Sequence, residues 1–436
     1  MVTKRGVIYY LWFFWYTMSY MSKKLSTEAY KGVRDFYPED MAVQNQIFDI
    51  WKSVSQKYGY QEYNASVLEP AELYKAKSGE EIVERQTYTF IDRGEREVTL
   101  RPEMTPTVAR MVAARKRELV YPLRWFSIPN FFRYEQPQRG RLREFWQLNV
   151  DIFGVESLQA EIECIQMAYD ITKAYGLSDE NFEIRINNRK LLNYITNTVF
   201  GLTAENSQKL LKLIDKKNKI PTEVFTATAE TILGDTPGGE KITKFNEIFS
   251  STNLDAFEGV TEVKQVIAEL EKLGIKNTRF DQTLTRGSDY YTGIVFEIFD
   301  KNPENRRSVF GGGRYDDLLD LFGGEKVPAV GFGAGDVVAK DLMETYGKLG
   351  NGSVPADIGI CVMNAESMNF AQEVAQTLRA KNMKVSIDFS GRKIGDQIKN
   401  ADKMKIPEVI VIGEEEVKTG KFKIKNLASG EEKTYA

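Results

Sequence analysis

The 436-residue chain contains no histidine. This absence excludes Ser-His-Asp triads, histidine general bases and histidine metal ligands. Only two cysteines occur, Cys164 and Cys361, and they lie far apart in the sequence. A disulfide framework and a cysteine zinc site are therefore excluded as well, and a reducing, cytoplasmic compartment is expected. Any active site must use Arg, Lys, Glu, Asp or Tyr side chains, or bound ions.

Net positive charge is also lacking, because 59 Lys and Arg residues oppose 62 Asp and Glu residues, for a formal net charge of −3. The overall charge therefore does not indicate nucleic-acid binding, although a local basic patch on an acidic protein is enough to bind nucleic acid. Apolar residues make up 42% and charged residues 28%, which is typical of a globular protein. The length predicts two or three domains.

The N-terminal segment differs from the rest of the chain. Val7–Met21 holds no charged residue and many aromatic ones. It is at or just below the lower length limit for a membrane span, and it lacks the cleavage site of a signal peptide. Three interpretations stay open: an upstream extension with Met21 as the working start, an interfacial membrane anchor, or an arm that binds a partner or self-associates. We expect an extension at 1–20 and no stable membrane partner.

Two predicted strands frame a polar surface. Arg124–Tyr134 and Glu144–Phe153 are expected to be strands, joined by a basic loop at 136–143. On the second strand the polar residues alternate with apolar ones and therefore share one face. On the first strand, two further polar residues share a face. This pattern predicts the polar floor of a pocket on an antiparallel sheet. The polar residues are Gln147, Asn149 and Asp151 on the second strand and Arg133 and Glu135 on the first.

The remaining segments predict the other elements. Met41–Tyr58 has helical periodicity, and a strand is expected from Tyr60 to Leu68. A lysine-rich stretch at about 195–260 favours a small inserted helical domain. Strands are expected at Thr278–Phe299 and at Ser308–Phe310. Two glycine-rich runs follow, Gly311–Gly313 and Gly331–Gly335, and the second precedes a helix.

The C-terminal part follows a linker at 346–355 that is rich in Gly, Ser and Pro. Beyond it, expected strands at Ile358–Met363, Val385–Phe389 and Val409–Ile412 alternate with helices. This alternation predicts an α/β domain with a parallel sheet at 356–436.

Five segments occur in an order that identifies one protein family. They are KGVRDFYPED (31–40), FFRYEQPQRGRLREFWQLNVDIFG (131–154), TRGSDYYTG (285–293), FGGGRYDDL (310–318) and IGDQIKNADKMKIPEVIVIGEEE (394–416). In this order they resemble the class II aminoacyl-tRNA synthetases, and among them the histidyl enzymes. The helix and strand before Pro70 resemble class II motif 1, the dimer-forming element, and the second segment resembles motif 2.

This resemblance implies an α+β catalytic domain with an antiparallel sheet flanked by helices, a helical insertion and a C-terminal α/β anticodon-binding domain. The expected domains are an extension at 1–20, a catalytic domain at 21–345 with the insertion at about 195–260, a linker at 346–355 and the anticodon-binding domain at 356–436. It also implies a cytoplasmic homodimer. Such an enzyme activates L-histidine with ATP to histidyl-adenylate and pyrophosphate, with Mg²⁺ on the ATP phosphates. It then transfers histidine to the 3′ end of tRNA(His).

The expected chemistry requires fixed positive charge. The histidine carboxylate attacks the α-phosphate of ATP, and both reactants are anions, so cations must stabilise the developing negative charge. Guanidinium groups suit this task because they stay charged and bind oxygens in pairs. The resemblance implies that Arg133 holds the α-phosphate and that Arg286 bridges carboxylate and phosphate. Glu135 is expected at the adenine amine. The other ATP-binding residues implied are Arg141, Gly333 and Gly335.

Recognition of histidine must depend on its imidazole ring. The resemblance implies that Asp151 and Tyr291 are partners of the ring nitrogens, with Tyr290 beside them. A site that hydrogen-bonds both nitrogens rejects analogues, because its own polar groups would be left unpaired. The residues implied for the α-amine are Glu103, Thr105 and Gln147.

Structural alternatives exist for these assignments. Arg133 and Glu135 could form an ion pair within a strand, and Gly311–Gly313 could be a turn. Both tyrosines, Tyr290 and Tyr291, could be core aromatics. The loop arginines could be solvated or could contact the tRNA acceptor end. These loop residues are Arg139, Arg141 and Arg143.

One position departs from the family pattern. Class II motif 3 usually carries an arginine three residues after its second glycine, and Val338 occupies that position here. Lys340 or another group would then hold the terminal phosphates. Two other functions are compatible with parts of the pattern: the regulatory paralogue of ATP phosphoribosyltransferase, and a tRNA-sensing module fused to a kinase. The first usually lacks both the C-terminal domain and the TRGSDYYTG signature, and no kinase motif occurs in the chain.

Overall fold

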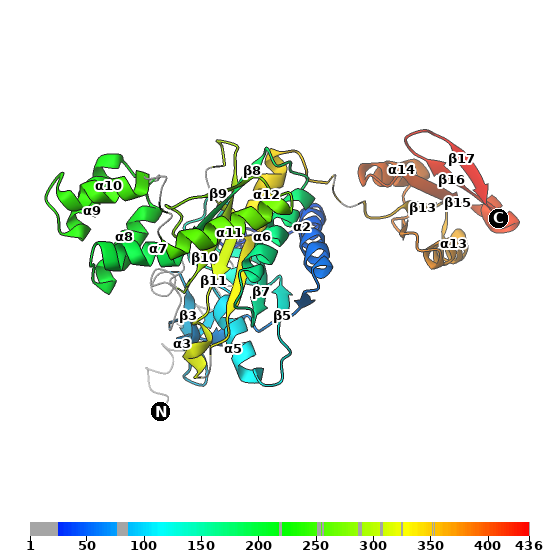
Figure 1. Ribbon diagram of the computed structural model, residues 1–436. Coiled ribbons are helices and arrows are strands. Elements are labelled where there is room, and N and C mark those ends of the chain that lie inside the picture. Colours follow the sequence, from blue (N-terminus) through cyan, green and yellow to red (C-terminus); the bar gives the residue numbers. More distant parts are fainter. Residues whose placement is uncertain are drawn as a thin grey trace, which may run out of the picture. The chain divides into compact units, whose positions relative to one another are not determined.

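The computed structural model describes residues 25–75, 86–217, 220–250, 254, 257–286, 290–305, 308–323, 326–350, 352 and 354–435. They form two compact units (Figure 1): the first contains the described residues up to Phe36 and Val43–Leu349, and the second contains Tyr37–Ala42 and the described residues from Gly350 onward. The expected extension at 1–20 lies outside the described residues. Within the described part, no helix has the length and apolar character needed to cross a membrane.

A mixed sheet forms the centre of the first unit. Among the described residues it has nine strands, in the order β1-β5-β7-β12-β11-β10-β8-β9, with β6 paired to β7. The central pairs are antiparallel, whereas the outer pairs β1·β5 and β8·β9 are parallel. The strands are β1 (Gln61–Glu62), β5 (Leu123–Ser127), β6 (Asn130–Phe132), β7 (Glu144–Phe153), β8 (Phe182–Asn188), β9 (Thr278–Phe280), β10 (Ile294–Asp300), β11 (Ser308–Arg314) and β12 (Ala329–Gly335).

Helices cover one face of this sheet, and Figure 1 shows α6 and α11 lying across its strands. The alternate residues Leu148 and Val150 of β7 are fully buried there, as the alternation predicted. Helix α2 contributes Ile47 and Trp51 at a helical spacing, so its apolar stripe faces the same core. The covering helices are α2 (Pro38–Lys57), α6 (Gln159–Ala174), α11 (Glu258–Lys272) and α12 (Asp336–Thr345).

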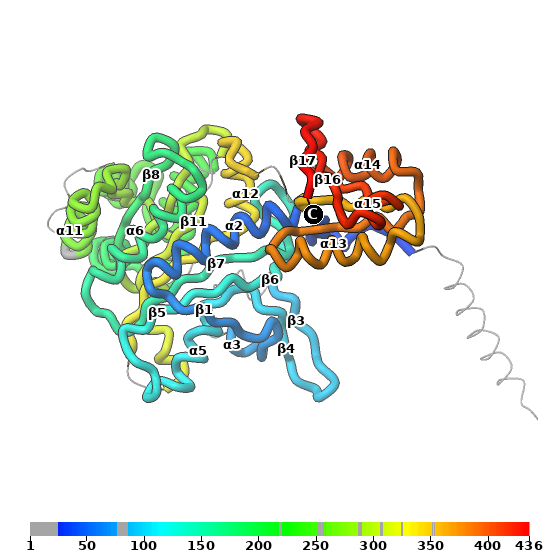
Figure 2. Tube along the Cα trace, turned by 90° about the vertical axis from the view of Figure 1, so that its right-hand side faces the viewer, coloured from blue at the N-terminus to red at the C-terminus, as the bar shows by residue number. Residues whose placement is uncertain are grey.

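The opposite face carries the candidate site. Helix α5 (Thr105–Arg115) and the 3-10 turn Leu319–Phe322 pack there against a second apolar cluster that includes Phe153 and Val295. A small sheet lies beside α5 in Figure 2 and contains β2 (Leu68–Pro70), β4 (Glu97–Leu100) and β3 (Tyr88–Ile91), with α3 (Glu72–Lys75) next to it. This face is less completely covered by helices than the other one.

The segment between β8 and α11 is helical and has a hydrophobic core of its own. Leu210, Phe225 and Phe245 are among its buried side chains. Thr203 caps one helix by accepting a hydrogen bond from the backbone of Asn206. The elements are α7 (Arg189–Asn193), a π-helix (Tyr194–Val199), α8 (Ala204–Asp215), α9 (Thr222–Leu233) and α10 (Glu240–Ser250).

The second unit is a five-stranded sheet with helices. The order is β14-β13-β15-β16-β17, and the first three strands are parallel. The three strands expected from the sequence are therefore parallel, as predicted, whereas β16 and β17 are two further strands that were not expected and that pair antiparallel at the edge of the sheet. The elements are β13 (Ile358–Val362), α13 (Met368–Ala380), β14 (Val385–Ile387), α14 (Ile394–Lys403), β15 (Glu408–Ile412), α15 (Glu414–Thr419), β16 (Phe422–Asn426) and β17 (Glu432–Tyr435).

Three expected strands of the first unit are shorter than predicted. The strand expected from Tyr60 to Leu68 contains only the two-residue β1 and the start of β2. The strand expected at Arg124–Tyr134 is divided into β5 and β6, because Pro129 has no N–H to donate in a ladder. The strand expected at Thr278–Phe299 is interrupted between β9 and β10. Each interruption places polar residues on a connecting segment beside the sheet.

Candidate active site

Glycines form a floor across two central strands of the sheet. Gly311 pairs with Gly333 and Gly313 pairs with Gly331, so these residues lie within β11 and β12 and not in a turn. A Cβ atom built on Gly311 would lie 2.5 Å from Arg286 Nη1, and one on Gly333 would lie 2.6 Å from Gln147 Nε2. The floor therefore consists of glycine because functional side chains lie directly over it.

The polar face of β7 borders this floor. Asp151 pairs in register with Gly331, and Gln147 pairs with Gly335. Asp151 is 4% exposed, and the hydroxyl of Tyr315 donates a hydrogen bond to its Oδ1 atom. Burial raises the pKa of Asp151 to about 7, against the opposing effect of the Tyr315 and Tyr63 hydroxyls. This carboxyl group can therefore change its charge near neutral pH.

Tyr315 is a site residue that the sequence did not single out. It lies two residues after the glycine run in the segment FGGGRYDDL, directly after the end of β11, and this position beside a strand end was the available signal. Its ring is fully enclosed with Val295 and Ala329 in the apolar cluster of the site face. The residue combines an apolar body with a hydroxyl that contacts Asp151.

Two neighbouring tyrosines form an aromatic wall. The ring of Tyr290 lies 4.9 Å from that of Tyr291 and 5.8 Å from that of Tyr315. Tyr291 is buried, and a Cβ on Gly313 would lie 3.0 Å from its ring. Burial raises the pKa of Tyr291, and the Glu103 carboxylate also raises it. The structure thus places Tyr290, Tyr291 and Glu103 around the same space.

Arg286 reaches the floor from the segment that connects β9 and β10. Its Nη1 donates a hydrogen bond to the Phe296 carbonyl (3.3 Å), and its Nε lies 3.6 Å from Glu297 Oε1. The guanidinium carbon lies 5.6 Å from the centre of the Tyr291 ring. Residues 287–289 of the same motif lie outside the described residues. These contacts hold the Arg286 cation over Gly311.

Arg133 lies just beyond β6 and contacts the segment before α5. Its Nε donates to the Pro102 carbonyl (2.9 Å), and its guanidinium lies 5.3 Å from the centre of the Phe145 ring. Glu135 forms an ion pair with Arg141 (3.3 Å), so its partner is not Arg133. The ion pair considered as a structural alternative for Arg133 and Glu135 is therefore not formed.

Glu103 and Thr105 flank the start of α5. Glu103 is 6% exposed, and Thr105 is the first residue of the helix. The buried Arg101 fixes this segment by donating to the Asn130 carbonyl (2.9 Å) and to the Ala65 carbonyl (2.7 Å). The sequence did not identify Arg101 as a site residue. Its role is to bind backbone carbonyls of segments that are distant in sequence and that come close to it only in the tertiary structure.

The basic loop after β6 makes a tight turn. Gln138 and Arg141 form an isolated bridge around Gly140, which has a φ of +74°. The guanidinium carbon of Arg143 lies 4.0 Å from the centre of the Tyr134 ring. The side chains of Arg139 and Arg141 are instead largely exposed. Solvation and contact with an RNA end both remain compatible with these two exposed cations.

The start of α12 is the region in which the motif 3 arginine is missing. Val338 packs against the hydrophobic core behind the sheet. Asp336 is fully buried and accepts from Arg34 (2.6 Å), Gln44 (3.0 Å) and the Trp146 backbone (2.9 Å). Burial raises the pKa of the nearby Asp341, and three cations oppose that shift. These cations around the start of α12 are Arg139, Lys340 and Arg34.

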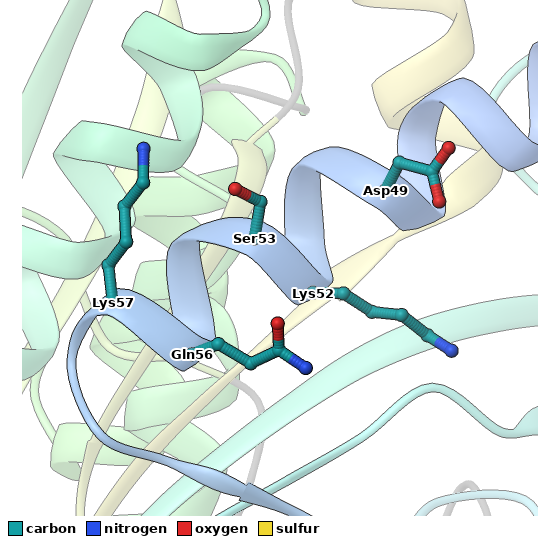
Figure 3. A pocket seen from close by; sticks show the side chains of 5 residues that line it. All are labelled: Asp49, Lys52, Ser53, Gln56 and Lys57. Atoms are coloured by element: carbon teal, nitrogen blue, oxygen red, sulfur yellow. The ribbon is translucent and has the colours of Figure 1, made fainter.

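The glycine floor coincides neither with a metal-binding cluster among the described residues nor with the surface depression along α2. Among the described residues, no group of three or more Asp, Glu or Cys side chains is arranged to hold a metal ion. A depression of about 560 Å³ lies along the outer side of α2 (Figure 3). All of its lining residues come from that one helix, so it is a surface feature separate from the glycine floor. They are Asp49, Lys52, Ser53, Gln56 and Lys57.

Comparison with known proteins gives consistent matches over nearly the whole chain. The family described as histidyl-tRNA synthetase matches residues 32–335, and the anticodon binding domain matches residues 357–436. A histidine–tRNA ligase of Leptospira biflexa is 42% identical over 425 residues, which are 95% of this chain and 96% of that protein. One of Halobacterium salinarum is 36% identical over 93% of this chain and 94% of that protein. The crystal structure of a histidyl-tRNA synthetase from Nostoc has a TM-score of 0.79 at 25% identity and covers 95% of this chain and 97% of that one.

Proposed function

Since this chain belongs to the histidyl-tRNA synthetase family, we propose that it joins L-histidine to tRNA(His) on the glycine floor of its central sheet. The observation that carries this proposal is the ring of side chains around the floor: Arg286 over Gly311, Gln147 over Gly333, and Asp151 beside Gly331. The chain is an ATP-dependent histidine–tRNA ligase and not the regulatory paralogue, because it matches such ligases over their whole length, including the C-terminal domain.

The first step forms histidyl-adenylate. An oxygen of the histidine carboxylate attacks the α-phosphorus of ATP, and the bond to pyrophosphate breaks. No proton needs to move, since the carboxylate is already ionised, which suits a site without histidine. Arg286 and Arg133 stabilise the negative charge that develops, from positions fixed by Glu297 and by the Pro102 carbonyl. The 3′-terminal hydroxyl of the tRNA then attacks the carbonyl carbon and forms the ester, the bond to AMP breaks, and the hydroxyl proton passes to the departing phosphate.

Histidine is recognised by the polar side chains next to the floor. Asp151 accepts the ring N–H, and Tyr291 contacts the second ring nitrogen, with Tyr290 behind it. The buried carboxylate of Glu103, together with Thr105 and Gln147, binds the α-amine. A ligand without the ring N–H leaves Asp151 unpaired in a buried place, which costs about 1–3 kcal/mol.

ATP lies along the motif 2 strand and its loop. Glu135 contacts the adenine amine and Arg141 the phosphates, and Gly333 and Gly335 allow the nucleotide to approach the strand. Cations at the start of α12, Arg34 or Lys340 among them, take the place of the arginine missing at Val338. Mg²⁺ accompanies ATP and is held mainly by its phosphates.

The small sheet beside α5 supports a homodimer. Val67, Leu68, Phe90 and Ile91 are exposed on it or next to it. Neighbouring exposed apolar side chains indicate an interaction surface. We assign this surface to a second copy of the chain, in a cytoplasmic enzyme. Sedimentation of the full chain at micromolar concentration tests the assignment, and a monomer would contradict it.

The second unit supports tRNA binding at the carboxyl ends of its parallel strands. Phe389 lies just after β14 and is exposed, and the exposed cations Arg392 and Lys393 lie three and four residues further along the chain. An aromatic ring beside cations can stack on an unpaired base while the cations bind phosphates. We place the anticodon contact here.

The experiment that tests the function is pyrophosphate exchange. The full chain should incorporate labelled pyrophosphate into ATP only when histidine is present, and it should charge tRNA(His) when that RNA is added. Exchange with another amino acid, or no exchange with histidine, would contradict the proposal.

A further inference from the structure

Among the described residues, three buried polar atoms at and beside Asp151 have no hydrogen-bond partner: Asp151 Oδ2, the Tyr63 hydroxyl and Ser127 Oγ. The strand register brings them together on the side of β7 away from the glycine floor. Ser127 pairs with Asn149, and Trp125 pairs with Asp151. The Tyr63 ring lies 5.3 Å from that of Trp125, and its backbone N–H donates to the Phe126 carbonyl (2.9 Å).

Leaving these buried atoms unpaired lowers the free energy of unfolding. A buried polar atom without a partner destabilises a protein, and native structures keep few of them. Asp151 Oδ1 already accepts from Tyr315, so Oδ2 is the acceptor that lacks a donor. The hydroxyls of Tyr63 and Ser127 are donors without an acceptor in the same place. The Tyr63 hydroxyl lies close enough to Asp151 to lower the pKa of that carboxyl group, but it does not form a hydrogen bond of good geometry with Oδ2. A small approach of this hydroxyl when a ligand is bound would complete the set.

We propose that Tyr63 is a positioning residue of the histidine site. Its hydroxyl donates to Asp151 Oδ2 when histidine occupies the pocket, and Tyr315 donates to Oδ1. An ionised carboxylate has about four acceptor positions, so Asp151 can still accept the N–H of the imidazole ring. This inference rests on the proposed function, because it takes the ring to lie against Asp151.

The surroundings of Asp151 explain why a second donor matters. Burial favours the neutral carboxyl group, whereas the hydroxyls of Tyr315 and Tyr63 favour the carboxylate. Tyr290 lies against Tyr315, and the Cys164 thiol of α6, behind the sheet, is near enough for Asp151 to raise its pKa. Among the described residues, none of the groups that shift the pKa of Asp151 is a cation. Loss of the Tyr63 hydroxyl should therefore shift Asp151 toward its neutral form, which offers a competing O–H donor to the ring.

The test compares Tyr63→Phe with Tyr121→Phe in the full chain. The Tyr121 hydroxyl is also buried without a partner, and its ring packs against the same apolar cluster, so this variant controls for the loss of one hydroxyl. In histidine-dependent pyrophosphate exchange, Tyr63→Phe should raise the KM for histidine about tenfold and leave the KM for ATP unchanged. Tyr121→Phe should match the wild type in both.

A pH profile distinguishes a positioning role of Tyr63 from a purely structural role. Histidine itself titrates near neutrality, so kcat/KM is measured with triazolylalanine, an analogue whose ring stays neutral in this range. The acidic limb of the profile should move to higher pH in Tyr63→Phe and stay in place in Tyr121→Phe. Ser127→Ala, which removes the neighbouring hydroxyl, should shift the limb in the same direction by less.

The outcomes are distinct. An unchanged KM for histidine in Tyr63→Phe would overturn the inference. So would a raised KM with an unmoved acidic limb in both Tyr63→Phe and Ser127→Ala, since that result indicates a structural effect. Failure of the wild type to exchange pyrophosphate with histidine would instead refute the proposed function, and it is recognised without any variant.

Discussion

Arg286 lies over Gly311 in a backbone conformation with a φ of +47°, which residues with side chains rarely adopt. Its contacts with Glu297 and the Phe296 carbonyl keep the guanidinium in place before substrates arrive. A cation fixed in this way needs little reorganisation when negative charge develops on the α-phosphate. The residue therefore combines an unusual backbone with a constrained side chain.

Arg286→Ala should slow histidyl-adenylate formation by about 10² to 10³, because one preorganised donor contributes about 3 to 4 kcal/mol to transition-state stabilisation. The loss should appear mainly in kcat, since the interaction strengthens during the reaction. Single-turnover formation of the adenylate measures it. Arg124→Ala serves as a control, because Arg124 pairs with Glu163 away from the floor. A wild-type rate in Arg286→Ala would remove this residue from the mechanism.

Asp151 makes the ligand-free protein sensitive to pH. Its pKa is about 7 in the folded chain against an ordinary value of 3.8, so the folded state binds more protons between these values than the unfolded state does. The free energy of unfolding therefore falls as the pH rises through this range. Asp151→Asn, which cannot ionise, should be more stable than the wild type at about pH 8 by up to about 4 kcal/mol, and equally stable at about pH 4. Urea unfolding at both pH values measures this, and equal stability at the higher pH would contradict the burial of an ionised group.

At the scale of elements, the glycines of β11 and β12 decide where side chains can lie. A methyl group on Gly333 would meet the end of the flexible Gln147 side chain, whereas one on Gly335 would meet nothing within 4 Å. The two positions belong to the same strand and face the same side. They therefore allow a matched comparison of a crowded and an open glycine.

Gly333→Ala should displace the Gln147 amide and raise the KM for histidine about tenfold, which corresponds to the loss of one hydrogen bond to a charged group. Gly335→Ala should leave the KM for histidine unchanged. Steady-state exchange kinetics measure both variants. Equal KM values for histidine in the two variants would show that Gln147 does not contact the substrate.

For the whole molecule, the two compact units predict separable activities. The polar side chains around the glycine floor all belong to the first unit, and that unit has its own hydrophobic cores. A chain that ends at Gly350 should therefore keep histidine-dependent pyrophosphate exchange while its KM for tRNA rises at least tenfold, the equivalent of about 1.4 kcal/mol. Parallel exchange and charging assays measure this. An equal loss of both activities in a folded protein would contradict the separation.

The N-terminal 20 residues are proposed to be dispensable, because their aromatic composition differs from that of the rest of the chain. A chain that starts at Met21 should show the charging activity of the full chain. Membrane flotation of both forms accompanies the assay. Loss of charging in the shorter form would favour the interpretation of this segment as a functional arm.

The sequence by itself determined the family and the elements with strong periodicity. The alternation in Glu144–Phe153 predicted both the bounds of β7 and its polar face, because the period of a strand is set by local geometry. The stripe of α2 and the helices of the insertion were predictable for the same reason. The ordered motifs identified the histidyl-tRNA synthetase family, since each motif is short but their order is specific.

Only the tertiary structure decided how the site is enclosed. Sequence patterns did not show that Gly311–Gly313 continue a strand, because glycine favours turns unless neighbouring strands require it. The sequence patterns also did not predict that three further residues belong to the site, namely Tyr63, Arg101 and Tyr315. Their roles depend on pairing between strands that are distant in sequence, such as β1 with β5 and β7 with β12. Local propensity cannot encode such contacts, because burial and hydrogen bonding between distant segments exist only after the sheet has formed.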